Sequence, residues 1–230
     1  IKSQTKSTLL KIKIQASPND RFGLKFLFNM SAQFVETIKI KNGKAMFLGY
    51  HQARMERTIS RFFPKLAASA MPGLEQIVEA TADMELYKAR VVYGEQGVEL
   101  VEYAPYSMRQ IHSLKVVCDD DIEYNYKSTD RSRLNALVEK KGCCDEIVII
   151  KNGLVTDTSF TNIAIYDGTS WLTPKHPLLA GTKRACLLDR GAIKEADITI
   201  NDLMRAKRLR LFNAMIDFGE REIPISQVII

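Results

Sequence analysis

The stretch "YNYKSTDR", residues 124 to 131, places Lys127 directly before a Ser-Thr-Asp cluster and a helix-like run. Lysines are rarely buried without a partner, so Lys127 taken alone fits a solvated surface charge. A strand-to-helix junction is nevertheless a common place for functional residues, because a rigid scaffold positions them there. A desolvated lysine near other cations has a lowered pKa, and its neutral amine can form a Schiff base. The first alternative to a surface charge is therefore a reactive amine.

Four further motifs carry chemistry that complements such an amine. "HQARM" places Arg54 one helical turn after His51, and "VTDTSFTNIAI" places Asp157 at the start of a strand that returns through Asn162. "GTKR" opens a helix with Gly181, so that free backbone N–H groups there can hold a phosphate. "FNAM" follows a β run at a second loop. Taken singly, Arg54 fits a surface arginine, Asp157 a turn residue and His51 a structural histidine.

The composition is that of a globular protein with a buried core. The chain has 230 residues, of which 46% are hydrophobic and 26% charged, which suits one large domain or two small ones. No window approaches the roughly 18 consecutive apolar residues of a membrane-spanning helix. The first residues, "IKSQTKSTLLKIKIQ", do not have the pattern of a secretory signal. We therefore expect a cytoplasmic protein with no membrane partner.

Charge and cysteine content exclude two further classes of function. The net charge of +6 permits binding to nucleic acid or to acidic metabolites. The basic residues are spread along the chain and mixed with acids, so nucleic acid is not an expected partner. The spacing of the four cysteines does not match that of zinc ligands; they are Cys118, Cys143, Cys144 and Cys186. We expect reduced thiols and no metal site.

The first half of the chain reads as two hairpins around a helix. Residues 33–48 form two β-rich runs around Asn42-Gly43, a pair that supplies the positive φ angles of a tight turn. Residues 49–64 follow as a helix with an apolar stripe of Met55, Ile59 and Phe62, and Pro64 ends it. Residues 87–105 form a second hairpin around positions 94–97. Residues 103–113 have little periodicity and are the candidate interdomain linker.

The second half begins with a strand over 114–118 and a helix that follows Lys127. Ser128, Thr129 or Asp130 can cap the start of that helix, and Gly142 can end it. Residues 145–173 predict an antiparallel meander with turns at 152–153 and 167–168. Short helices are expected at 181–191 and from 200 onward. Strands and helices are segregated, so the fold class is α+β.

Together and in this order, the motifs resemble the class IV aminotransferases, which are fold-type IV pyridoxal-phosphate enzymes. The resemblance runs from about Phe34 to the end of the chain, through "FVETIKIKNGKAMFLGYHQARM", "YKSTDR", "EIVIIKNGLVTDTSFTNIAIYDG", "TPKHPLLAGTKRACLL" and "LFNAM" with a later "PI". It implies a homodimer whose cofactor is pyridoxal 5'-phosphate. It also implies a smaller N-terminal α/β sandwich, residues 30–113, and a larger β-barrel-like cofactor domain, residues 114–230. Residues 1–29 are then an N-terminal extension or a remnant of expression.

The resemblance also implies roles for individual residues. Lys127 matches the lysine that holds the cofactor covalently and then moves a proton. Asp157 matches the carboxylate that keeps the pyridine nitrogen protonated, which makes the ring an electron sink. The cofactor phosphate is matched by the side chain of Arg54, the helix start at Thr182 and Lys183, and the second loop at Asn213 and Ala214.

Three features depart from the family pattern. The family usually has glutamate where this chain has Asp157, whose side chain is one methylene shorter. The helix start usually reads Gly-Ile-Thr-Arg, whereas residues 181–184 read Gly-Thr-Lys-Arg, so a threonine hydroxyl contact is lost and a cation gained. The first strand of the family is not recognisable in residues 1–29.

The resemblance leaves two reactions of a small amino substrate open. A 4-amino-4-deoxychorismate lyase would release 4-aminobenzoate and pyruvate for folate biosynthesis, whereas a transaminase would act on branched-chain or D-amino acids. The lyase is favoured by the short chain after Met30, by "FNAM", by Asp130-Arg131 and by Thr37, which matches a proton-transferring threonine of lyases. A non-catalytic basic binding protein is the remaining alternative. The candidates for holding substrate carboxylates are Arg90, Arg109 and Arg131.

Overall fold

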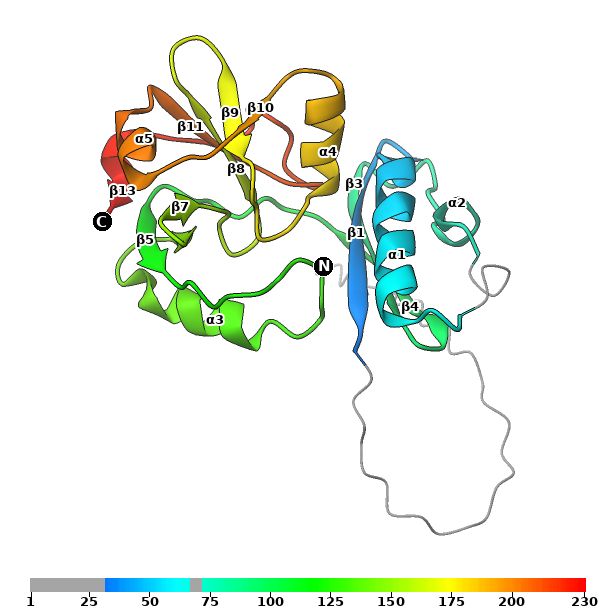
Figure 1. The fold of residues 1–230 in the computed structure, drawn as a ribbon. Coiled ribbons are helices and arrows are strands. Elements are labelled where there is room, and N and C mark those ends of the chain that lie inside the picture. Colours follow the sequence, from blue (N-terminus) through cyan, green and yellow to red (C-terminus); the bar gives the residue numbers. More distant parts are fainter. Residues whose placement is uncertain (1–31, 67–71) are drawn as a thin grey trace, which may run out of the picture.

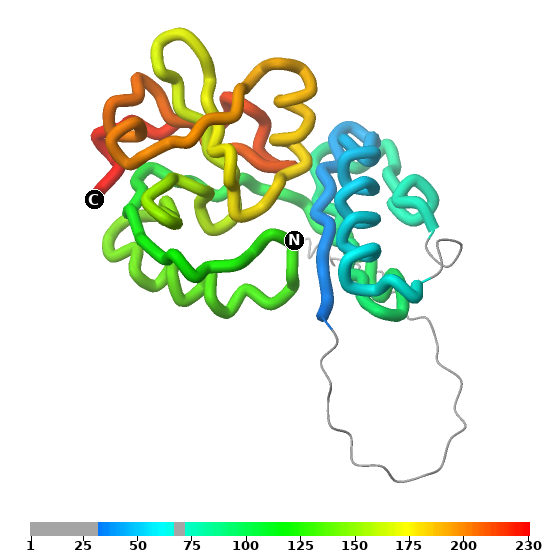
Figure 2. The backbone as a smooth tube through the Cα atoms, viewed as in Figure 1, coloured from blue at the N-terminus to red at the C-terminus, as the bar shows by residue number. Residues whose placement is uncertain are grey.

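The structure is a computed structural model that describes residues 32–66 and 72–230. The predicted N-terminal extension, residues 1–29, lies outside the described residues. The described chain folds into two lobes that lie side by side (Figure 1). Figure 2 shows them as successive colour ranges, blue to green and green to red, so each lobe is built from one continuous part of the chain.

The small lobe is an antiparallel sheet with helices on one side. Its elements are β1 (Phe34–Lys41), β2 (Lys44–Ala45), α1 (Leu48–Phe62), α2 (Leu74–Ile77), β3 (Leu86–Gly94) and β4 (Gly97–Pro105). The strand order is β2-β1-β3-β4. Both predicted hairpins are present, and Asn42 and Gly43 have φ angles of 49° and 69° in the first turn. Residues 103–105 of the proposed linker belong to β4, and residues 106–113 have no regular secondary structure.

Alternate residues of β1 face different partners. Phe34, Ile38 and Ile40 pack into the core beneath α1, and Glu36 points the same way, into contact with α1 side chains. Between them, Thr37 faces the space between the lobes, and Lys39 pairs with Asp217 of the large lobe. Strand β1 therefore connects the small-lobe core to the space between the lobes.

Helix α1 ends at Phe62, just before Pro64, as predicted, but its predicted apolar stripe is partly wrong. Met55 is buried, whereas the Phe62 side chain is 41% exposed. The buried face of α1 also includes polar side chains, namely His51, Arg54 and Thr58. The reason is the buried carboxylate of Glu36 on β1, which gives two of these polar side chains a partner.

The large lobe contains the remaining elements of the described chain. Its strands are β5 (Leu114–Cys118), β6 (Glu146–Lys151), β7 (Leu154–Val155), β8 (Asn162–Tyr166), β9 (Trp171–Pro174), β10 (Lys194–Ala196), β11 (Arg208–Phe212), β12 (Glu222–Ile223) and β13 (Val228–Ile229). Its α-helices are α3 (Ser132–Val138), α4 (Thr182–Asp189) and α5 (Ile200–Arg205), with 3₁₀ turns at Glu139–Lys141 and Ile225–Gln227. Two sheets, β10-β9-β8-β11-β12 and β13-β5-β6-β7, enclose a shared apolar core.

The predicted meander over 145–173 is wrong as a single unit. β6 pairs with β7 in one sheet, whereas β8 pairs with β9 and β11 in the other. The chain changes sheets between β7 and β8, where Asp157 and Asn162 form an isolated bridge. The functional segment of this motif therefore lies at the corner between two sheets.

The overall class is α+β with curled sheets, as predicted from the sequence. The predicted cap of α3 by Ser128, Thr129 or Asp130 is wrong, because the N-cap residue is Arg131 and no side chain caps the helix. Asp130 Oδ1 instead accepts a hydrogen bond from Ser132 N–H over 2.9 Å in the turn that leads into the helix. None of the helices in the described part of the chain is both long and apolar enough to span a bilayer.

Candidate functional site

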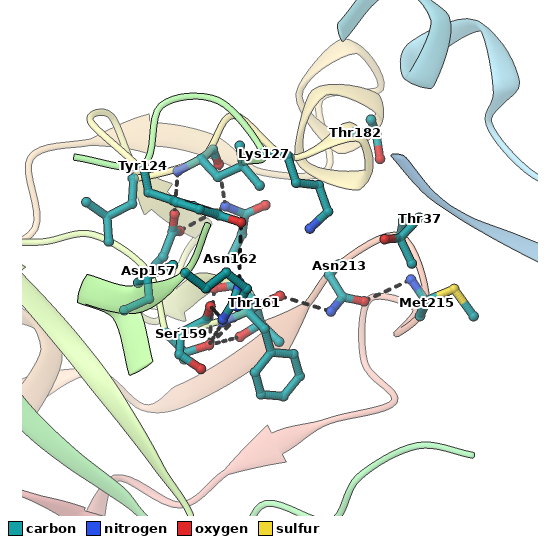
Figure 3. Close-up of a pocket in the computed structure, with 18 of the residues that line it drawn as sticks. Thr37, Tyr124, Lys127, Asp157, Ser159, Thr161, Asn162, Thr182, Asn213 and Met215 are labelled. Atoms are coloured by element: carbon teal, nitrogen blue, oxygen red, sulfur yellow. Dashed lines mark hydrogen bonds between the residues drawn. The ribbon is translucent and has the colours of Figure 1, made fainter. Parts of the chain in front are cut away.

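A cavity of about 300 Å³ lies between the two lobes (Figure 3), which is within the range of small-molecule sites. The small lobe contributes residues of β1, α1 and β3, and the large lobe contributes residues of α3, β8 and α4 together with loops. Seven of the eight predicted catalytic and cofactor-binding residues line it: Thr37, Arg54, Lys127, Asp157, Thr182, Asn213 and Ala214.

The Lys127 segment is fastened to the small lobe by backbone hydrogen bonds. Val35 N–H donates to Lys127 O over 2.9 Å, and Thr129 N–H donates to Gln33 O over 2.9 Å. The amine projects into the cavity (Figure 3). Burial and the nearby Arg54 guanidinium lower the pKa of Lys127 to about 8. Near neutral pH, far more of this amine is neutral and nucleophilic than in an ordinary lysine.

Asp157 is buried, and both of its carboxyl oxygens accept hydrogen bonds. Oδ1 accepts from Asn162 Nδ2 over 2.8 Å, and Oδ2 accepts from Leu179 N–H over 2.9 Å. Asn162 Nδ2 also donates to Leu179 O over 2.9 Å. Burial raises the pKa of Asp157 to about 7, although these hydrogen bonds oppose the rise. A cation placed against this carboxyl group would favour its ionised form.

The guanidinium group of Arg54 forms two hydrogen bonds with the buried carboxylate of Glu36. Arg54 Nε donates to Glu36 Oε1 over 2.9 Å, and Nη2 donates to Oε2 over 2.5 Å. Burial alone would raise the pKa of Glu36, but the Arg54 guanidinium and a hydrogen bond with His51 lower it to about 2. The described chain provides no acceptor for Arg54 Nη1, so this nitrogen is available to an anion in the cavity.

His51 connects the same carboxylate to the start of α4. Its Nδ1 lies 2.6 Å from Glu36 Oε2, and its Nε2 lies 3.4 Å from Thr182 Oγ1. Burial lowers the pKa of His51, so the ring is neutral. Because ionised Glu36 can only accept, Nδ1 carries the proton and Nε2 accepts from the Thr182 hydroxyl. This leaves the backbone N–H of Thr182 as its donor for a ligand.

The start of α4 is open to an anion. Gly181 is the N-cap residue, and no side chain caps the helix, so the first N–H groups are available. A Cβ atom at Gly181 would overlap Asn162 Oδ1. The glycine therefore permits close packing between the helix start and the Asp157 network.

Asn213 shapes the second loop. Its Oδ1 accepts from Met215 N–H over 2.8 Å and from Ile216 N–H over 2.9 Å, while its Nδ2 donates to Phe160 O over 3.1 Å (Figure 3). These bonds hold the turn in one conformation and leave the N–H of Ala214, which lines the cavity, as the remaining donor of the turn.

The sequence model of the family described as amino-transferase class IV matches residues 33–220. The chain belongs to the class IV aminotransferase family. Members of this family are pyridoxal-phosphate enzymes, in line with a lysine, an arginine and an open helix start around one cavity.

The chain is also similar to individual proteins and solved structures. An uncharacterised Haemophilus influenzae protein is 36% identical over 182 residues, which cover 78% of this chain and 96% of that protein. A crystal structure from Haemophilus somnus, provisionally described as a 4-amino-4-deoxychorismate lyase, has a TM-score of 0.74 at 36% identity and covers 80% of this chain and 97% of its own. A Mycobacterium tuberculosis protein described as a hypothetical aminotransferase, in its pyridoxal-phosphate-bound form, shares the fold, with a TM-score of 0.61 at 16% identity over 86% of this chain and 85% of that one.

The residues around the cavity of this class IV family member suit the family's cofactor. The cofactor has an aldehyde, a basic ring nitrogen and a phosphate, and the cavity has an amine, a carboxyl group and a set of anion-binding N–H and guanidinium groups. No group of three His, Cys, Asp or Glu side chains suited to a metal ion occurs within 32–66 and 72–230.

Four predicted residues need separate comment. Arg109 and Arg131 line the cavity, whereas Arg90 pairs with Glu102 over 3.0 Å and is not part of the lining. The Lys183 side chain also lies away from the cavity, buried against Asp217.

Sequence reasoning missed several residues of the site. Lys88, Tyr106, Tyr124 and Ser159 line the cavity. For Lys88, the alternation of β3 was a usable signal, because residues 89, 91 and 93 form the core face and residue 88 must face the other way.

Proposed function

We propose that this protein is a 4-amino-4-deoxychorismate lyase that uses pyridoxal 5'-phosphate. The observation that carries the proposal is a group of cations that shares the cavity with Lys127, namely Lys88, Arg109 and Arg131. The substrate has one amino group and two carboxylates, and cationic side chains are the preferred partners of carboxylates. The provisional description of the Haemophilus somnus protein supports the same reaction.

The chain itself would bind the substrate and move one proton. The cavity cations orient the two carboxylates, and the Arg54, Thr182 and Ala214 donors hold the cofactor phosphate. When bound, the cofactor supplies an electron-withdrawing ring, and ionised Asp157 stabilises the protonated ring nitrogen. The neutral Lys127 amine takes the proton from the carbon that bears nitrogen and returns it to the enolpyruvyl side chain.

Thr37 is the second proton-transfer group of the proposal. Its hydroxyl lies on β1, across the cavity from the Lys127 amine (Figure 3). Loss of pyruvate makes the ring aromatic, so the reaction needs no 2-oxo acid as a second substrate.

The decisive experiment supplies 4-amino-4-deoxychorismate without a 2-oxo acid and measures 4-aminobenzoate and pyruvate. We expect equal amounts of both products from the wild type and none from Lys127→Ala, which should also lack the absorbance band of lysine-bound cofactor. Arg109→Gln should raise KM by about tenfold or more, because a charged hydrogen bond to substrate is lost. Arg90→Gln is the matched control and should leave KM unchanged.

The transaminase is the competing outcome of the same assay. It would be supported if turnover required an amino acid donor and a 2-oxo acid acceptor. Formation of 4-aminobenzoate only in the presence of the acceptor would contradict the lyase proposal.

A further inference from the structure

The side chain of Lys183, which stands where the family has threonine, enters a buried ion cluster. Lys183 Nζ donates to Asp217 Oδ1, and it lies 4.0 Å from the centre of the Phe47 ring. Lys39 Nζ binds the other oxygen of the same carboxylate, Oδ2, over 2.7 Å. One carboxylate thus holds two lysines, and Glu220 Oε2 lies 4.0 Å from Lys39 Nζ.

The two lysines of this cluster are removed from water, while their partner is not. The side chains of Lys39 and Lys183 are 4% and 6% exposed, whereas that of Asp217 is 37% exposed. Burial would raise the pKa of Asp217, but hydrogen bonds from both ammonium groups lower it overall. Without this carboxylate, two buried ammonium groups would face each other, and only Glu220 would remain near one of them.

Each member of the cluster is close in sequence to a residue of the cavity. Lys39 follows Thr37 by two positions on the same face of β1. Lys183 is the neighbour of Thr182 at the start of α4, and Asp217 directly follows the turn that Asn213 shapes. The cluster therefore ties two segments at the phosphate end of the cavity, the start of α4 and the 213–216 turn, to β1 of the small lobe.

We propose that Lys39, Lys183 and Asp217 act as positioning residues that hold the helix start and the 213–216 turn in the geometry required by the cofactor phosphate. None of the three residues lines the cavity. This inference rests on the proposed binding of pyridoxal 5'-phosphate, and it is independent of which reaction follows.

The test compares the affinities for pyridoxal 5'-phosphate and for pyridoxal, which lacks the phosphate. Both ligands can react with Lys127, but only the first uses the phosphate end of the cavity. We expect Asp217→Asn to raise the Kd for pyridoxal 5'-phosphate at least tenfold and the Kd for pyridoxal less than twofold. Asp189→Asn is the matched control and should change neither value. Asp189 is an exposed carboxylate on α4, the helix that carries Lys183, and it accepts a hydrogen bond from the Tyr50 hydroxyl over 2.9 Å.

A second variant keeps the inference testable if Asp217→Asn fails to fold. Lys183→Met keeps the Lys39–Asp217 pair and removes one cation. It should weaken binding of pyridoxal 5'-phosphate at least threefold with little effect on pyridoxal. In the double variant that combines Asp217→Asn with Lys183→Met, the Lys183 substitution should raise the Kd for pyridoxal 5'-phosphate by a smaller factor than it does alone. The reason is that it removes an ammonium group that Asp217→Asn has already left unpaired.

The inference would be overturned if the ratio of the two Kd values stayed unchanged. This includes an equal loss of affinity for both ligands, which would indicate a general loss of structure. A chain that binds pyridoxal 5'-phosphate with the expected ratios, but makes no 4-aminobenzoate, would contradict only the proposed reaction.

Discussion

Lys127 and Asp157 owe their shifted pKa values to the same cause, which is burial at a cavity between two lobes. Burial disfavours the charged form of each, so the pKa of the lysine falls to about 8 and that of the aspartic acid rises to about 7. Each buried charge makes folding less favourable, and a ligand group of opposite charge would remove this cost. Functional groups commonly reduce the stability of the ligand-free protein in this way.

The stability of the empty protein should therefore increase in Lys127→Met. Below pH 8 the lysine is charged in both the folded and unfolded states, so the folded state carries the full burial cost. Between pH 8 and the usual 10.5 the folded state loses its proton first, and the cost disappears. We expect Lys127→Met to stabilise the empty protein by about 2 kcal/mol at pH 7 and to have almost no effect near pH 10.5. Urea unfolding at both pH values measures this, and an equal gain at both would contradict it.

At the scale of single elements, a turn that depends on adjacent residues could be predicted from the sequence, whereas pairing between distant segments could not. The Asn42-Gly43 hairpin was predictable because the turn depends on two adjacent residues. The change of sheet between β7 and β8 was not, because it depends on the pairing of β8 with β11, more than forty positions later in the sequence. The polar buried face of α1 was hidden for the same reason, since its partner Glu36 is on another element.

The contact between Gly181 and Asn162 makes a prediction about the junction of α4. A Cβ at position 181 would overlap Asn162 Oδ1, and Asn162 in turn holds Asp157 and Leu179. Gly181→Ala should therefore displace the Asp157 network and weaken binding of pyridoxal 5'-phosphate by roughly tenfold, about one lost hydrogen bond. Fluorescence titration of the empty protein measures the affinity.

Gly49→Ala provides the control for that substitution. Gly49 lies in the first turn of α1, and a Cβ there would have no neighbour within 4 Å. The substitution should leave cofactor affinity unchanged and stabilise the helix by up to about 1 kcal/mol. If Gly181→Ala behaved in the same way, the proposed role of the glycine would be wrong.

At the scale of the whole molecule, the candidate site exists only where the two lobes meet. Positions 37 to 214 converge on one cavity, and no periodicity in the sequence encodes that convergence. The ordered motifs pointed to Arg54 and Lys127, whose residue types match the family pattern, and to Asp157, which keeps a carboxylate where the family usually has glutamate. They could not reveal Glu36, whose importance depends on Arg54 opposite it in space, and only the alternation of β3 indicated that Lys88 faces the cavity.

Because both lobes line the cavity, ligand binding should stabilise both together. Free pyridoxal 5'-phosphate at 100 times its Kd should raise the free energy of unfolding by about 2.7 kcal/mol. Hydrogen exchange should slow in β1 of the small lobe and in α4 and residues 127–129 of the large lobe, because these segments are joined by backbone bonds or face the ligand. Lys127→Ala should lose most of this protection. Protection confined to the large lobe would contradict a site shared between the lobes.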